Sequence, residues 1–126
     1  MRFVHELPHA ASALHPARER LDLWCRTSGL DTEAILIVAN ELCTNAIQQG
    51  QGPVRLRAQG TATQVAISVE QSIGQSRKRP RVLPASAWET GGRGLRIVSA
   101  IAQSWGWHCD RRTLTVWATL EQMPAA

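Results

Sequence analysis

Two side chains able to take part in chemistry lie four positions apart in the chain, the carboxylate of Glu41 and the amide of Asn45. A helix would place both on one face, with Asn45 at the edge of the apolar stripe and Glu41 just beside it. Taken alone, the pair is typical of a helix boundary where two side chains hydrogen-bond locally, so it indicates a site only in combination with other features.

A glycine-rich segment, Gly91-Gly92-Arg93-Gly94, follows a long stretch without periodicity and precedes a helical pattern. Glycines allow backbone N–H groups to approach phosphate oxygens, and the N-terminus of a helix favours negative charge. The segment could therefore bind phosphate. A turn that needs positive φ angles would explain the same glycines, so the segment by itself leaves both interpretations open.

Apolar periodicity predicts two helices before this segment. Residues 10–28 repeat apolar side chains at helical spacing and stop at Gly29, a residue that suits a helix C-terminus. A second helix is expected to begin at a cap on Asp31 or Thr32 and to end near Gly50. This second helix would carry the paired carboxylate and amide.

Three segments alternate apolar and polar residues, as expected for strands that bury one face: 54–58, 65–69 and 114–120. The first two are separated by a glycine-containing turn and predict a hairpin. A third helix is expected from Leu95 to about Trp105. The pattern predicts an α+β fold, a two-layer α/β sandwich whose mostly antiparallel sheet is covered by helices on one face.

Residues 71–90 lack periodicity and contain a basic run from Arg77 to Arg81. A loop of this length in a small chain is usually functional or mobile. The basic run could contact a phosphate or an acidic partner, or it could be a solvated surface loop, and the sequence leaves these alternatives open. No internal repeat or second domain is indicated, so residues 1–126 are interpreted as one domain.

Composition excludes several classes of protein. The content of 44% hydrophobic and 19% charged residues is that of an ordinary globular chain, and the net charge of +4 is too modest to indicate nucleic-acid binding. The longest uninterrupted apolar run, residues 34–39, is far shorter than a membrane-spanning helix. His5 and Glu6 interrupt any apolar run behind the N-terminus. We therefore expect a cytoplasmic protein.

The histidines, cysteines and tryptophans give weaker signals. The four histidines and three cysteines show neither metal-ligand nor disulfide spacing, so the cysteines are interpreted as reduced, mostly packed thiols. Trp24 and Trp105 fall on helical apolar positions and are assigned to the core. Trp117 points to the face opposite Leu114 and Val116, which makes it the best candidate for an aromatic residue at an interface.

In combination, three segments carry a resemblance to a known family: Glu41-Leu42-Cys43-Thr44-Asn45-Ala46, Gly92-Arg93-Gly94-Leu95 and Trp105-Gly106-Trp107. They resemble the bacterial anti-sigma-factor serine kinases, the RsbW-like group of the histidine-kinase-like (GHKL) ATPase superfamily. The match extends over nearly the whole chain in the order of its elements. The combination is specific even though no single segment is.

The resemblance implies a role for each of these residues. Asn45 would supply its side-chain oxygen to a Mg²⁺ ion that bridges the phosphates of ATP, and Glu41 would orient or deprotonate the attacking hydroxyl. The segment Gly92-Arg93-Gly94-Leu95 would bind the phosphates, chiefly through the amides of its two glycines. Residues 71–91 would form the lid over the nucleotide.

The chain departs from the family at the end of the strand over residues 65–69. Relatives carry an Asp there, which accepts a hydrogen bond from the adenine amino group, and a Gly two residues later. This sequence has Gln71 and Ile73 instead. The carbonyl oxygen of Gln71 can still accept that hydrogen bond, but it is neutral, and Ile73 adds bulk where a backbone would approach the base.

Two functions follow from the resemblance and its departure. The first is a serine/threonine kinase and anti-sigma factor that binds ATP and Mg²⁺, sequesters a sigma factor and phosphorylates a STAS-type anti-anti-sigma protein, as a monomer or a homodimer. The second is a degenerate ATPase-fold module that holds a regulatory partner without ATP turnover, and Gln71 and Ile73 favour it. Nucleic-acid binding ranks last because no nucleic-acid motif is recognisable.

Overall fold

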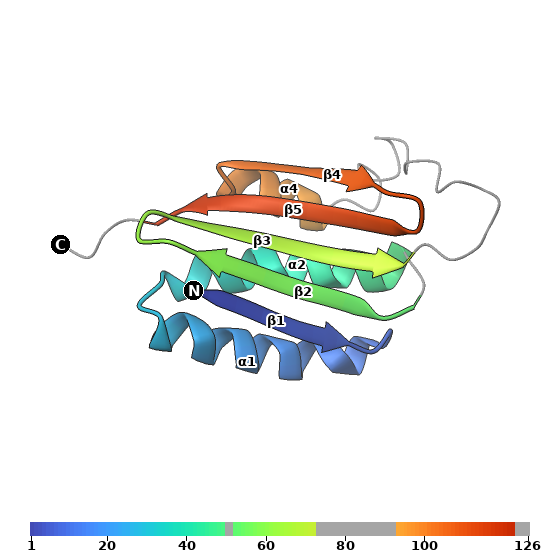
Figure 1. Ribbon diagram of the computed structural model, residues 1–126, viewed down its shortest axis with the longest axis horizontal. Coiled ribbons are helices and arrows are strands. Elements are labelled where there is room, and N and C mark those ends of the chain that lie inside the picture. Colours follow the sequence, from blue (N-terminus) through green and yellow to red (C-terminus); the bar gives the residue numbers. More distant parts are fainter. Residues whose placement is uncertain (50–51, 73–92, 123–126) are drawn as a thin grey trace.

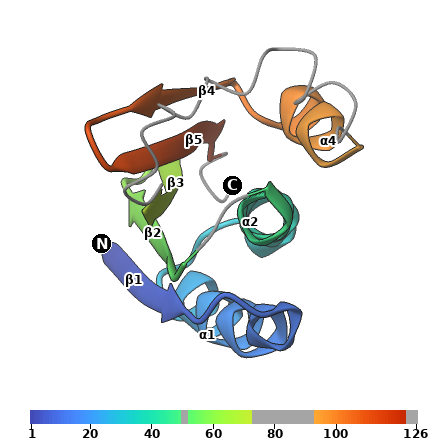
Figure 2. The same cartoon turned by 90° about the vertical axis from the view of Figure 1, so that its right-hand side faces the viewer.

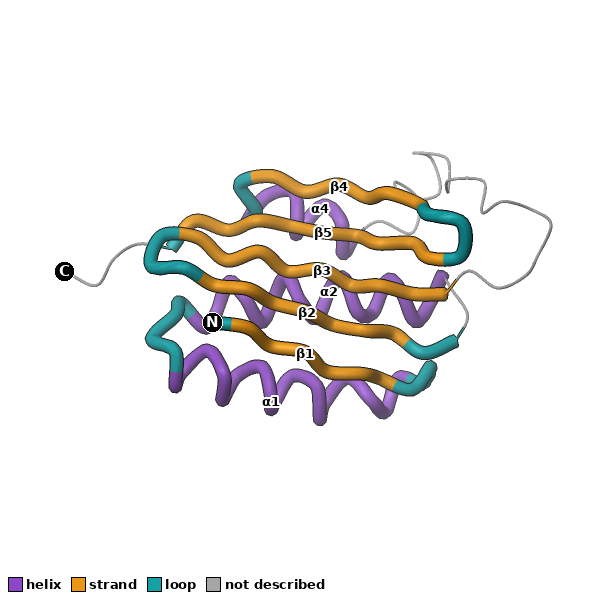
Figure 3. The backbone as a smooth tube through the Cα atoms, viewed as in Figure 1, coloured by secondary structure: helices purple, strands orange, loops and turns teal. Residues whose placement is uncertain are grey.

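The computed structural model describes residues 1–49, 52–72 and 93–122. These residues form one five-stranded sheet and a layer of helices (Figures 1 and 3). In chain order the elements are β1 (Arg2–Leu7), a 3₁₀ turn η1 (Ala11–Ala13), α1 (Leu14–Thr27), α2 (Thr32–Gln49), β2 (Val54–Gly60), β3 (Gln64–Ser72), α4 (Arg93–Ile101), β4 (Ser104–Cys109) and β5 (Thr113–Glu121).

The strand order across the sheet is β1-β2-β3-β5-β4, and every pair of neighbours in it is antiparallel. Helices α1, α2 and α4 lie on one face, and no described element covers the other (Figure 2). This arrangement confirms the predicted two-layer α+β sandwich and the hairpin between β2 and β3. Within the described residues, no helix combines the length and apolar character needed to cross a membrane.

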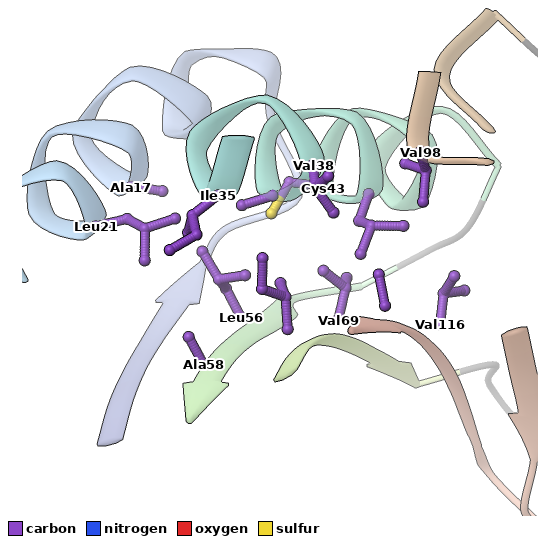
Figure 4. Close-up of a cluster of buried hydrophobic side chains, with 14 of the residues drawn as sticks. Ala17, Leu21, Ile35, Val38, Cys43, Leu56, Ala58, Val69, Val98 and Val116 are labelled. Atoms are coloured by element: carbon purple, nitrogen blue, oxygen red, sulfur yellow. The ribbon is translucent and has the colours of Figure 1, made fainter. Parts of the chain in front are cut away.

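The core lies between α2 and the middle strands because both present one apolar face. On β3, Val65, Ile67 and Val69 are each at most 1% exposed, while the residues between them point to the uncovered face. Helix α2 packs Ile35, Val38 and Cys43 toward these strands (Figure 4), and Leu42 belongs to the same buried core. Each fully buried aliphatic side chain contributes roughly 1.5–3 kcal/mol to stability.

Strand β1 was not predicted from the sequence. Its inward-facing residues are Phe3, His5 and Leu7, and the histidine interrupts the apolar alternation that normally identifies a strand. Burial lowers the pKa of His5, and the nearby charge of Arg20 lowers it further, so the neutral ring is favoured at this position. The Phe3 ring lies 6.4 Å from the His5 ring and 5.8 Å from that of Trp24.

The third helix is shorter than predicted. It ends at Ile101, and the backbone N–H of Gln103 then donates to the carbonyl of Thr119, which starts the pairing of β4 with β5. Trp105 therefore lies in a strand, where its indole nitrogen donates to the Ser99 hydroxyl at 3.0 Å. The spacing of Trp105 from the helical residues before it fits a helix, whereas its alternation with Trp107 fits a strand. The pairing of β4 with β5 shows that the strand is formed.

Trp117 lies on the uncovered face of the sheet, as predicted, and is half-buried there. Gly106 faces it on the neighbouring strand β4. A Cβ atom at position 106 would come within 2.8 Å of Cζ2 of the Trp117 ring, so the close approach of the indole requires glycine.

All three cysteines are free thiols, as predicted, but their environments differ. Burial raises the pKa of Cys43 to about 12. Burial, together with Asp22 and Asp31, raises the pKa of Cys25 to about 11. Cys109 is exposed, and its pKa is raised by a smaller degree of burial.

We therefore predict that an aromatic disulfide reagent modifies Cys109 rapidly in the native protein, whereas Cys25 and Cys43 react only after unfolding. The thiolate is the reacting form, so the rate at Cys109 should keep rising as the pH is raised through the ordinary thiol range. Absorbance of the released thiol measures both phases, and Cys109→Ala should abolish the fast one. Rapid modification of all three thiols without denaturant would contradict the described core.

Candidate functional site

The buried face of α2 fixes the direction of its two polar candidates. Leu42 and Cys43 are 1% and 2% exposed, and they hold the helix against the sheet. Glu41 and Asn45 share a flank of the helix and are both partly exposed, beside this apolar face as predicted. The buried neighbours prevent the helix from rotating about its axis. The side chains of Glu41 and Asn45 therefore stay on this flank, where a ligand can contact them.

Gln71 ends the row of buried residues on the helix-facing side of β3. It pairs with Val54 of β2 and Leu114 of β5, and it is only 4% exposed. Its side-chain nitrogen donates to the backbone carbonyl of Gly52 at 3.4 Å. The side-chain oxygen is the acceptor of this amide, so it is the atom of Gln71 that can accept a hydrogen bond from a ligand.

Helix α4 can contribute the backbone N–H groups of its N-terminus to a ligand site, because its side chains Leu95 and Val98 are buried in the core. Arg93 and Gly94 lie in its first turn, which contains no acidic residue. Leu95 is 5% exposed and Val98 is fully buried, so both side chains belong to the core. A contact between Leu95 and a nucleotide would therefore involve its backbone N–H, one of the unpaired donors at the start of a helix.

These three parts lie at the same end of the molecule. Gln71 pairs with the start of β5, whereas α4 ends just before Ser104, which pairs with Thr119 near the far end of β5. Helix α4 must therefore begin on the Gln71 side. Helix α2 ends on that side too, because only four residues separate Gln49 from β2, whose first residue pairs with Gln71 (right-hand end of Figure 1).

Several predicted site residues lie outside the described residues. They are Gly92 and the lid from Ile73 onward, which contains the basic run from Arg77 to Arg81. The side chain of Arg93 is likewise outside the description. The roles assigned to these residues stay predictions.

One contributor was missed at the level of sequence. Gly52 was not singled out in the sequence, yet its carbonyl accepts a hydrogen bond from the Gln71 amide, which joins the segment after α2 to the end of β3. Its φ of 79° is in the left-handed region that favours glycine. A glycine after a helix signals a turn, but the sequence gives no sign of which side chain that turn will contact.

The groups at this end are complementary to a phosphorylated ligand with a metal ion. Glu41 offers a carboxylate, Asn45 and Gln71 offer neutral oxygens, and the start of α4 offers N–H donors with the positive end of a helix dipole. Within the described residues, no group of three or more His, Cys, Asp and Glu side chains could hold a metal ion. A cation at this end would therefore need the ligand's own oxygens to complete its coordination.

Comparison with known proteins agrees with this geometry. No curated protein sequence matches the chain significantly. Residues 7–120 match the family described as the histidine kinase-like ATPase domain, a span that runs from the last residue of β1 almost to the end of β5 and includes every part of the candidate site. The chain belongs to the histidine kinase-like ATPase domain family.

Proposed function

We propose that this protein is a serine kinase and anti-sigma factor that uses ATP and Mg²⁺. Membership of the histidine kinase-like ATPase family supports an ATP-binding regulatory role. The observation that carries the proposal further is that the last turns of α2, which include Asn45, lie at the same end of the molecule as Gln71 and the start of α4, with Glu41 one turn earlier on the same flank of α2. The sigma factor and the STAS-type antagonist come from the resemblance to the anti-sigma-factor kinases.

The residues present fit such a nucleotide at its phosphate end. When bound, ATP would supply the phosphoryl group, and Mg²⁺ would neutralise charge on the phosphates. Asn45 offers the metal an amide oxygen, the kind of hard ligand that Mg²⁺ prefers. The first N–H groups of α4 bind phosphate oxygens, and Glu41 accepts the proton of the serine hydroxyl on the antagonist.

The fit is weaker at the adenine end. Gln71 is neutral, so a hydrogen bond to its oxygen lacks the charge assistance that a carboxylate would provide. The hydrogen bond to Gly52 holds the amide in place and limits how far it can turn toward a base. The proposal therefore includes weak binding of ATP, with most of the affinity arising from the phosphates and the metal.

The same observation favours a second candidate function. If the buried Gln71 amide serves only to join β3 to the turn at Gly52, the chain is a partner-binding module that has lost ATP turnover. Its regulatory partner would then bind independently of the nucleotide. The two functions differ in whether ATP is turned over.

The catalytic role of Glu41 can be tested by Glu41→Gln. We expect phosphorylation of the STAS-type antagonist to slow about 10²- to 10⁴-fold, because the amide cannot accept the proton. Affinity for ATP should stay within about twofold, since the base acts on the hydroxyl and not on the bound nucleotide. Single-turnover assays with labelled ATP measure the first effect, and titration calorimetry measures the second.

A matched control is Glu33→Gln, which neutralises an exposed carboxylate in the first turn of the same helix. This variant should phosphorylate the antagonist at the wild-type rate. If Glu41→Gln does so as well, Glu41 is not the base.

The metal-binding role of Asn45 can be tested by Asn45→Ala. We expect this variant to bind ATP with the same affinity in the presence and absence of Mg²⁺, because the metal loses its proposed protein ligand. Calorimetric titrations with and without Mg²⁺ give the comparison. Asn40→Ala, which removes another half-buried amide from α2, should retain the wild-type dependence on Mg²⁺. An unchanged Mg²⁺ effect in Asn45→Ala would remove Asn45 from the site.

Adenine recognition can be tested at Gln71 in both directions. Restoring the family pattern with Gln71→Asp and Ile73→Gly adds charge assistance worth about 1 kcal/mol, so ATP should bind roughly fivefold more tightly. Gln71→Leu, which removes the acceptor, should weaken ATP binding by a similar factor. GTP affinity should change in neither variant. If neither the wild type nor the restored variant binds ATP at millimolar concentration, the partner-binding module replaces the kinase.

A further inference from the structure

Strand β4 forms one edge of the sheet, and no described strand lies on its outer side (Figure 1). The turn between β4 and β5 shows which backbone groups face inward, because Asp110 and Thr113 exchange two backbone hydrogen bonds, at 2.9 Å and 3.4 Å. Hydrogen-bonded pairs alternate along an antiparallel ladder, so Ser104, Gly106 and His108 also bond to β5. The residues that direct their N–H and C=O groups away from the sheet are Trp105, Trp107 and Cys109.

Aromatic side chains lie beside this edge on both faces of the sheet. Trp105 and Trp107 pair with buried residues of β5, so their half-buried side chains point to the helix-covered face. On the uncovered face, a Cβ atom at Gly106 would come within 2.8 Å of the Trp117 ring, so this ring extends from β5 over β4 toward the edge. A strand added beside β4 would therefore meet apolar surface on both of its faces.

Strand β4 also lacks the features that keep the edge of a sheet from pairing. Native edge strands are often protected by charged side chains or by proline. The sequence of β4 contains no proline, lysine, arginine, aspartate or glutamate. The opposite edge strand, β1, carries Arg2 and Glu6, and both are exposed. Of the two edges, β4 is thus the one suited to accept another strand.

We propose that the free edge of β4 binds an extended segment of a partner protein, which adds to the sheet as an antiparallel strand. Antiparallel pairing places the N-terminal end of that segment beside the turn that follows β4. Arg111 and Arg112 are exposed in this turn, and neither has an ion pair within the described residues. With Asp110 beside them, the turn carries a net positive charge. The segment that fits therefore begins with acidic residues and continues with apolar residues at alternate positions.

The proposed edge is separate from Gln71 of the candidate site, because β5 lies between β4 and β3. The inference therefore does not depend on the proposed function. The turn with Arg111 and Arg112 nevertheless lies at the same end of the molecule as that site, since Thr113 after it pairs with Ser72 of β3. Affinity for ATP thus serves as a control for any change to these two arginines.

A synthetic peptide tests the pairing, with two glutamates followed by three valine-threonine repeats and with both ends blocked. Its valines would oppose Cys109, Trp107 and Trp105 in turn, so their N–H groups bond to β4 while the threonine N–H groups point outward. We expect binding at submillimolar concentration by calorimetry. N-methylation of the valines should abolish it, whereas N-methylation of the threonines should leave the affinity within about twofold. Binding that survives methylation of the valines, or no binding of the unmodified peptide at millimolar concentration, would overturn the proposal.

Hydrogen exchange of the backbone amides locates the bound peptide. In the free protein, the outward amides of Trp105, Trp107 and Cys109 should exchange faster than those of the residues between them. The peptide should slow exchange at these three positions and leave Val4, on the opposite edge, unchanged. Protection of Val4 instead would contradict the assignment to β4. Protection of β4 that grows with protein concentration in the absence of peptide would assign the edge to a second copy and contradict it as well.

Charge reversal tests the acidic end of the segment. Arg111→Glu combined with Arg112→Glu should weaken peptide binding about three- to tenfold and leave ATP affinity unchanged. A control with the same net charge combines Arg2→Glu with Arg18→Glu, two exposed positions outside β4 and its turn, and it should bind the peptide as the wild type does. Circular dichroism checks that both variants are folded. Equal weakening by both pairs of substitutions, or loss of ATP affinity with peptide binding intact, would refute the proposed role of the turn.

Discussion

The fold and the candidate site both depend on how α2 is buried against the sheet. Its apolar face, including Ile35, Val38 and Leu42, packs on the alternating residues of the middle strands, and α1 and α4 pack on its sides. This packing leaves one orientation for the helix about its axis. Glu41 and Asn45 therefore project from a fixed flank, and their position relative to the end of β3 follows from burial rather than from any polar contact of their own.

Much of this arrangement could be predicted because it is encoded in local periodicity. The segments that became α2, β2, β3 and β5 each have a clean apolar repeat, and the two-layer fold follows from them. β1 was not predicted because His5, a polar residue, occupies an inward position and interrupts the apolar alternation. The fold accommodates it because burial favours the neutral ring. The extent of α4 was misjudged because Trp105 fits both a helical and a strand spacing, and only its pairing with Ala118 distinguishes them.

The candidate site was predicted less completely than the fold, for a physical reason. Residues on one helix, such as Glu41 and Asn45, have a spacing that sequence reveals, whereas the contact between Gln71 and Gly52 joins positions 19 residues apart. That contact depends on the register of β2 with β3, which no local pattern specifies to the residue. The contact also gives Gln71 a second role. Its position in the strand predicts that it binds adenine, but its side chain also stabilises the turn at Gly52.

The central claim is that the end of the molecule formed by α2, β3 and α4 binds ATP with Mg²⁺. The most direct test is a titration of isotope-labelled protein with ATP and Mg²⁺, followed by the backbone amide resonances. We expect the largest shifts at residues 41–45, around Gln71 and at the start of α4, with little change in the first turns of α1. Resonances that stay unchanged at millimolar ATP, or that shift only on the uncovered face of the sheet, would contradict it.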